Sequence, residues 1–471
     1  MLFNSLDFVV FFAVVYSAYL LLNHRWQNHL LLVASYFFYG CWDWRFLSLI
    51  ALSTSVDYVA SRRIFAARSD AMHTRHRWMA FSVIVNLGVL AFFKYFNFFA
   101  DSAETLLAAF GFNPTHLHLR IILPVGISFY TFQSMSYTLD VYRGQLKPAN
   151  SFFEYALFVS FFTQLVAGPI ERASNLLGQV QRPRVVTWSG IQMGCWLFFW
   201  GLFKKVVIGD NLAVWADQVF SGQVEWTTGT VLTAIYAFAL QIYCDFSAYS
   251  DMARGLGSFM GFNIMINFRN PYFALDPSDF WRRWHISLST WLRDYLYIPL
   301  GGNRKGLRRT YINLALTMLL GGLWHGAAWT FIWWGAFHGA LLAVHRFVRG
   351  EGTSERSLSG FGKLWRRVAM FHAVCFGWLL FRAVSIHDVL AMLKALVFQP
   401  GWSAACSAWV FQGVVFAVPL LIVQILQEKT KDQLAPLRLS LFPRALLYSC
   451  AALLLIAFAN TGSRAFIYFQ F

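Results

Sequence analysis

His325 is an ionisable residue inside a long apolar run from Leu314 to Val344. Ionisable groups are costly at membrane depth, so those that occur there usually mark a functional site. A neutral imidazole can accept a proton from an attacking hydroxyl group. We therefore predict that His325 is a catalytic base, although a hydrogen bond between helices would also explain a histidine in this position.

A second histidine, His285, lies upstream in a basic and aromatic segment from Phe280 to Tyr295. We predict that it serves as a second base or positions the substrate. The arginine and tryptophan residues around it are also typical of a membrane interface, where an anchoring role is the alternative.

Two polar clusters lie near these histidines in the sequence. Asp245 and Asp251 follow an apolar span, and structural hydrogen bonds are the commoner use of such residues. The loop from Gly301 to Gly306 combines glycine with cations that suit the phosphates of a cytosolic donor, or simply a solvated turn. The predicted donor-binding residues are Arg304, Lys305, Arg308 and Arg309.

The elements that must carry these residues are membrane helices. The chain has 471 residues, of which 58% are hydrophobic and 13% charged, and its mean hydropathy is +0.50. That is too little charge for a soluble globule of this size, so an all-α polytopic membrane protein is predicted. Apolar spans lie near 6–22, 30–60, 79–100, 121–139, 152–167, 190–208, 229–244, 311–345, 368–384, 408–426 and 444–459.

The longest of these spans, 311–345, has room for two helices. Proline and glycine interrupt the stretch from Pro114 to Pro183, and polar residues are threaded among aromatic ones from Gln241 to Gly301. Both stretches predict short re-entrant or interfacial helices. Since no repeat or long linker divides the sequence, we expect one integral membrane domain over 1–471, with a tail over 460–471.

The net charge of +16 is concentrated in loops between apolar spans, which we expect to face the cytoplasm. Anionic lipid headgroups explain this charge better than nucleic acid does, because the basic residues form no separate domain. The first apolar run follows no basic segment and reads as a retained helix. The six cysteines are scattered, so neither disulfides nor a metal site are predicted.

Three motifs together resemble the membrane-bound O-acyltransferase family, in particular its bacterial polysaccharide-acetylating branch. They are Trp281–Ser289, Tyr297–Asn303 and Gly321–Gly326, and shorter matches at Gly126–Tyr130, Ala167–Ile170 and Asp245–Met252 extend the similarity over most of the chain. The resemblance implies a ring of roughly eleven or more transmembrane helices, with re-entrant helices, around a central funnel. It also implies that His325 is the family's principal histidine and His285 its second polar position.

The resemblance further implies a donor, partners and a location. Acetyl would come from acetyl-CoA or another cytosolic acetyl thioester, with no permanently bound cofactor. It would pass across the bacterial inner membrane to periplasmic polysaccharide O-acetyltransferases, near a polysaccharide synthase complex, for acetylation of an exopolysaccharide such as alginate or cellulose.

The C-terminal residues Arg464–Phe471 contain Tyr468 among aromatic residues. An interfacial anchor is one explanation. The segment also resembles the tyrosine-bearing tail of the small partner of the D-alanyl-transferring member of the family, which implies that Tyr468 carries the acyl group. A phenol, with a pKa of about 10, leaves more readily than a sugar alkoxide and so preserves transfer potential.

Two other functions remain open at this stage. D-alanyl transfer to teichoic acid uses the same family chemistry, and detection of acetyl or D-alanyl on the product separates the two. A transporter or export channel without covalent chemistry would also have broken helices and intramembrane polar groups.

Overall fold

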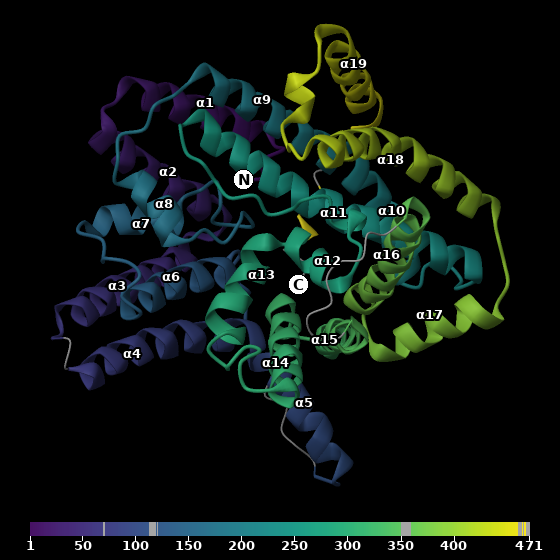
Figure 1. Cartoon of the computed structure of the whole chain (residues 1–471), viewed down its shortest axis with the longest axis horizontal. Coiled ribbons are helices and arrows are strands. Elements are labelled where there is room, and N and C mark those ends of the chain that lie inside the picture. Colours follow the sequence, from purple (N-terminus) through teal and green to yellow (C-terminus); the bar gives the residue numbers. More distant parts are fainter. Residues whose placement is uncertain are drawn as a thin grey trace. The chain divides into compact units, whose positions relative to one another are not determined.

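The described residues of the chain form helices and no strands. The computed structural model describes residues 1–68, 71–112, 119, 121–349, 359–459, 464, 466 and 467 (Figure 1). They fall into two compact units, residues 1–194 with 256–265 and residues 195–255 with 266–471. The prediction of an all-α fold is confirmed, and that of a single functional domain over 1–471 stays a prediction.

The first unit begins with α1, whose N-terminus is capped by the Ser5 hydroxyl. Its core includes the buried Asp57 carboxylate, which accepts hydrogen bonds from Asn86 at 2.9 Å and Thr138 at 3.0 Å. The helices are α1 Leu6–Leu21, α2 His24–Asp43, α3 Leu47–Ala66, α4 Met72–Leu90, α5 Phe96–Ala109, α6 Ile127–Tyr142, α7 Phe152–Ser160 and α8 Ala173–Val180. A π-helix, Ala91–Tyr95, joins α4 to α5, and a 3₁₀ turn, Trp44–Phe46, precedes α3.

The second unit holds all the candidate catalytic residues that are described. Helices α9 (Trp188–Phe203) and α11 (Thr228–Phe259) have residues in both units. The remaining helices are α10 Asp210–Phe220, α12 Pro277–Arg283, α13 Ile286–Leu292, α14 Leu307–His325, α15 Trp329–Arg349, α16 Gly360–Arg382, α17 Ile386–Phe398, α18 Ala404–Thr430 and α19 Leu441–Phe458. Two π-helices, Lys204–Gly209 and Arg293–Tyr297, and the 3₁₀ turns Pro271–Phe273 and Ala435–Arg438 complete it.

Six helical stretches in the described residues are long and apolar enough to cross a membrane. They are Met72–Ala109, Trp188–Phe220, Thr228–Phe259, Gly360–Arg382, Ala404–Thr430 and Leu441–Phe458. This supports a multi-pass membrane protein, whereas the predicted number of roughly eleven or more is not confirmed. The central funnel stays a prediction.

Local structure in the interrupted stretches differs from expectation in one place. The short helices α7 and α8 lie in Pro114–Pro183, and α12 and α13 lie in the later part of Gln241–Gly301, whereas their re-entrant or interfacial position stays a prediction. Residues 241–259, however, continue the long helix α11, so the prediction of a short helix there is wrong. The polar residues that suggested an interruption are buried and paired inside the unit, as Asp245 and Lys205 are at 2.6 Å.

Helices α14 and α15 form a hairpin with almost no space between their main chains. A β-carbon at Gly322 would lie 2.2 Å from the Phe331 carbonyl oxygen, and one at Gly335 would lie 2.3 Å from that of Met318. Small residues permit this approach, as in other membrane helix pairs. The predicted division of span 311–345 into two helices is confirmed, and the turn between them directly follows His325.

Candidate active site

His285 and His325 lie together in the second unit. His325 is the last residue of α14 and His285 immediately precedes α13, and both side chains are buried. Their ring centroids are 6.3 Å apart. Two groups able to accept or donate a proton are therefore close enough to act on one bound substrate.

Aromatic rings enclose His325. The centroid of its ring lies 5.2 Å from Trp324, 5.0 Å from Trp334 and 5.4 Å from Phe381, in each case with the ring planes steeply inclined. Such walls exclude water and lower the local dielectric, which strengthens every polar interaction that a substrate makes inside.

The backbone at His285 is in the left-handed region, with φ 42° and ψ 55°. This conformation is uncommon for a residue with a side chain and persists only where its surroundings enforce it. The Ile286 N–H donates to the Asn267 carbonyl at 2.9 Å, and the Arg269 N–H donates to the Arg283 carbonyl at 2.9 Å. These two main-chain bonds hold the turn that directs His285 inward.

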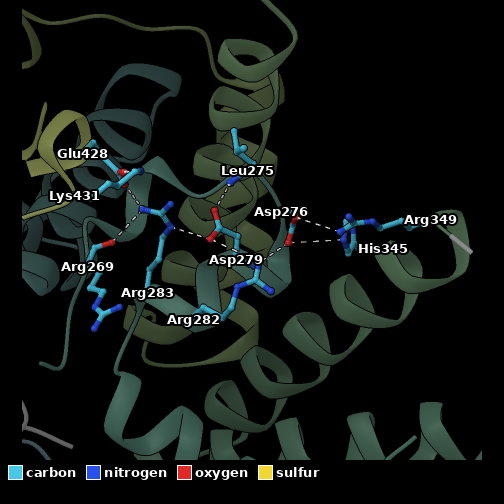
Figure 2. Close-up of polar contacts among 10 residues, drawn as sticks. All are labelled: Arg269, Leu275, Asp276, Asp279, Arg282, Arg283, His345, Arg349, Glu428 and Lys431. Atoms are coloured by element: carbon cyan, nitrogen blue, oxygen red, sulfur yellow. Dashed lines mark hydrogen bonds and ion pairs between the residues drawn. The ribbon is translucent and has the colours of Figure 1, made fainter. Parts of the chain in front are cut away.

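Ion pairs fix the helix that leads into this turn (Figure 2). The Asp276 carboxylate caps α12 by accepting from the Asp279 N–H at 2.7 Å, as expected for an Asp-Pro start. Asp279 pairs with Arg283 at 2.9 Å, and the Arg283 guanidinium also contacts Glu428 near the end of α18. Arg283 thus ties the end of α12 to another helix, two residues before His285.

Asn267 determines which nitrogen of His285 carries the proton. Its side-chain oxygen accepts from the Ser287 N–H at 3.2 Å and the Ser287 hydroxyl at 3.0 Å, and it lies 3.2 Å from His285 Nδ1. Because that oxygen is an acceptor, a neutral His285 must donate from Nδ1, which leaves Nε2 as the basic nitrogen. Burial lowers the pKa of His285 to about 3, so the ring is neutral at physiological pH.

A third histidine, His338 on α15, belongs to the same aromatic group. Its ring centroid lies 4.7 Å from Trp334 and 5.2 Å from Trp281, and it is buried. Neither of its ring nitrogens has a hydrogen-bond partner among the described residues. His338 was not predicted from the sequence, although it lies in the same apolar run as His325 and carries the same signal of an ionisable group at membrane depth.

The predicted donor-binding residues lie far from the histidines. They are exposed in the loop before α14 and in its first turn. With a rise of about 1.5 Å per residue, the part of α14 between Arg308 and His325 is about 26 Å long. A donor bound at this loop would have to extend along the helix to present its thioester. Tyr468 lies outside the described residues, and no group of potential metal ligands occurs within them.

Comparison with known proteins shows the family of the chain. The sequence profile of the membrane-bound O-acyltransferase family matches residues 145–351. A probable alginate O-acetylase of Pseudomonas putida is 44% identical over 403 residues, which cover 85% of this chain and 81% of the relative. The chain belongs to the membrane-bound O-acyltransferase family.

Two further relatives show the range of reactions within this family. A peptidoglycan O-acetyltransferase of Helicobacter pylori is 37% identical over 429 residues, covering 84% of this chain and 80% of the relative. A teichoic acid D-alanyltransferase of Bacillus subtilis is 26% identical over 289 residues, covering 58% of this chain and 72% of the relative. The protein is thus a membrane O-acyltransferase, and the alternative of a transporter without covalent chemistry is not supported.

Asn267 was also not predicted from the sequence, and its replacement tests its role in acyl transfer. Asn267→Ala removes the oxygen shared by His285 and Ser287, so we expect acyl transfer to fall roughly tenfold or more, as for the loss of a buried hydrogen bond of 1–3 kcal/mol. The measurement is the acyl-transfer rate per amount of membrane-inserted protein. Gln427→Ala, which removes a buried amide that bonds the Gln433 carbonyl, is the matched control and should retain activity.

A double-mutant cycle decides whether Asn267 acts through His285. If it does, Asn267→Ala should add almost nothing to the loss already caused by His285→Ala. Losses that multiply would show that Asn267 supports the site independently of that histidine.

Proposed function

We propose that this O-acyltransferase moves acetyl groups from a cytosolic thioester across the bacterial inner membrane for O-acetylation of an exopolysaccharide of the alginate or cellulose type. The donor is acetyl-CoA or another acetyl thioester. Relatives named for the O-acetylation of alginate and of peptidoglycan support acetyl as the transferred group. They carry different polymer names, which suits a protein that supplies acetyl to a separate polymer-specific enzyme.

The observation that carries the proposal is the buried pair of His285 and His325. Their rings are 6.3 Å apart, and His285 is neutral with its basic nitrogen at Nε2. In our proposal His325 is the general base, and His285 orients the attacking group or acts as a second base. The enclosing aromatic side chains keep water from hydrolysing the thioester.

The first transfer moves the acetyl group from the thioester to Tyr468. The phenolic oxygen attacks the carbonyl carbon of the acetyl thioester while His325 removes the phenolic proton. The carbon–sulfur bond breaks, and the leaving thiolate takes that proton from His325. The products are a free thiol and an acetyl ester of Tyr468, and His325 is again neutral.

The second transfer delivers acetyl to a periplasmic O-acetyltransferase. A hydroxyl oxygen of that partner bonds to the acetyl carbon of the Tyr468 ester, the bond between the phenolic oxygen and the acetyl carbon breaks, and the phenolic oxygen takes up the proton that the hydroxyl loses. That partner then acetylates the polysaccharide, beside the synthase complex that exports it. The membrane lipids around the basic loops are the remaining partners in the proposal.

The first prediction tests the general base. His325→Ala should abolish product acetylation with near-normal membrane insertion, because one imidazole moves the proton while the aromatic packing holds the fold. His285→Ala should cause a severe but incomplete loss. His372→Ala, which removes an exposed histidine of α16, is the matched control. Normal acetylation by well-inserted His325→Ala would remove His325 from the mechanism, and product analysis would identify acetyl or D-alanyl as the transferred group.

The second prediction concerns the basic loop. If Arg304, Lys305, Arg308 and Arg309 attract the donor's phosphates, the double variant Arg308→Glu/Arg309→Glu should raise the donor KM and weaken its dependence on salt. The control Arg62→Glu/Arg63→Glu reverses another adjacent exposed pair, on α3. Donor binding that changes with neither ionic strength nor charge reversal in the loop would exclude this loop as the docking surface.

The third prediction isolates the proposed nucleophile. Tyr468→Phe keeps the aromatic ring and deletes the hydroxyl group, so polymer acetylation should disappear while protein abundance stays normal. Mass spectrometry of the wild type should detect an acetylated C-terminal peptide. Tyr448→Phe, on α19, is the control for loss of a phenol elsewhere. Normal acetylation by Tyr468→Phe would contradict the relay and favour the C-terminal segment as an interfacial anchor.

A further inference from the structure

Three charged side chains form a buried group within two of the apolar membrane helices. Lys205 Nζ lies 2.9 Å from an Asp210 oxygen and 2.6 Å from Asp245 Oδ1, and all three residues are at most 5% exposed. Charges at such depth are costly unless paired, and they commonly serve a function. One lysine shared between two carboxylates leaves this group with excess negative charge.

A local change of helix type brings the lysine to this position. Residues Lys204–Gly209 form a π-helix between α9 and α10, a widened turn of the kind often found at functional sites. Lys204, on the same turn, donates to Asp251 at 2.8 Å and to Ser247 at 2.7 Å. Both lysines are thereby directed at α11, whose carboxylates they neutralise in part.

The C-terminal segment supplies the remaining partner of Asp245. The Ile467 main-chain N–H donates to Asp245 Oδ2 at 2.7 Å. Phe466 is 2% exposed, with its ring centroid 5.2 Å from that of Tyr249 and 5.8 Å from that of Phe246. The segment is therefore an internal part of the second unit at these residues.

A second carboxylate holds the segment three residues earlier. Arg464 pairs with Asp217 at 2.7 Å, and the other oxygen of Asp217 pairs with Arg382 at 2.7 Å. Asp217 is on α10 and Arg382 ends α16, so this contact joins the C-terminal segment to two helices. The two contacts fix both the position and the direction of the chain that enters the core.

The docked segment lies one side chain away from the histidine pair. The Phe246 ring meets the His285 ring edge-on with centroids 4.6 Å apart, and the same ring also lies beside Phe466, at 5.8 Å between centroids. Asp245 and Phe246 are adjacent on α11. Asp245, which binds the main chain of the C-terminal segment, is therefore next to Phe246, which contacts His285.

We propose that Asp245 and Asp217 are positioning residues that bind the C-terminal segment and thereby hold the residue after Ile467, Tyr468, for reaction at the histidine pair. This inference rests on the proposed function. Asp245 recognises a main-chain N–H, which is unchanged whether the next side chain carries an acyl group or not. The segment therefore stays bound through both transfers, and only the acyl group moves.

The decisive variant is Ile467→Pro in the full-length protein, because proline deletes the N–H that Asp245 accepts and leaves Asp245 and Tyr468 intact. We expect kcat for acetyl transfer to fall roughly tenfold to a hundredfold, as for a lost hydrogen bond to a charged group. The KM for the donor should stay unchanged. Ile467→Val keeps the N–H and should restore the wild-type rate, whereas a rate loss in both variants would overturn the proposal.

Protease access gives a readout independent of activity. In detergent, carboxypeptidase should trim the C-terminus of Ile467→Pro and of Arg464→Gln at least several-fold faster than that of the wild type. Asp245→Asn, which retains an oxygen acceptor but lacks the charge, should give an intermediate rate of trimming. Equal trimming of the wild type and Ile467→Pro would overturn the binding role.

The two proposals can fail separately. If Tyr468→Phe is inactive while Ile467→Pro transfers acetyl normally, the relay stands and the binding role of Asp245 is wrong. If Ile467→Pro is inactive and readily trimmed while Tyr468→Phe is fully active, Asp245 positions the segment as we infer, and the tyrosine relay is wrong.

Discussion

The contact between the main chains of α14 and α15 is the constraint on which the site depends. Gly322 and Gly335 leave no room for a β-carbon, so the two helices are held at a fixed separation and rotation. His325 ends α14, and Trp334, on α15, packs against it with ring centroids 5.0 Å apart. Because the packed interior of a protein tolerates little displacement, a larger residue at either glycine would move His325 relative to the aromatic side chains around it.

The second requirement is that the polar groups around His285 Nδ1 share a specified partner. Asn267 is the example, since its single side-chain oxygen serves the Ser287 N–H and hydroxyl and His285 Nδ1. A buried polar network of this kind holds one arrangement, because each alternative leaves a donor or acceptor unsatisfied. The result is a histidine with a defined tautomer as well as a defined position.

The sequence pointed to the two histidines that the structure brings together, but not to the residues that hold them in place. His325 and His285 stood out because ionisable groups are rare in apolar segments, and the structure places them together. Asn267 carried no such signal, because its value comes from contacts with residues near position 285 that only the fold creates. The helical class followed from composition, whereas the number of spans did not, since some of the predicted spans form helices too short to cross a membrane, such as α1 with 16 residues.

The prediction for residues 241–259, which belong to α11, was wrong for the same reason, because the contacts that decide it are created only by the fold. Asp245 and Asp251 lowered the local hydropathy, and the sequence therefore suggested that the span stopped before them. Lys204 and Lys205 lie 40 or so positions earlier in the chain and neutralise those carboxylates inside the unit, which removes the reason for the helix to stop. Long-range pairing of charges cannot be read from a hydropathy window.

Helix α11 directs the Asp245 carboxylate and the Phe246 ring to different neighbours. Consecutive residues on an α-helix point about 100° apart, so Asp245 and Phe246 face different neighbours. Asp245 meets Lys205 and the Ile467 N–H, while Phe246 presents an apolar ring to His285. A carboxylate directly beside His285 would stabilise its protonated form and raise the pKa of the imidazole. By placing a phenylalanine there, the fold keeps the imidazole neutral, and it uses the adjacent carboxylate to hold the chain that leads to Tyr468.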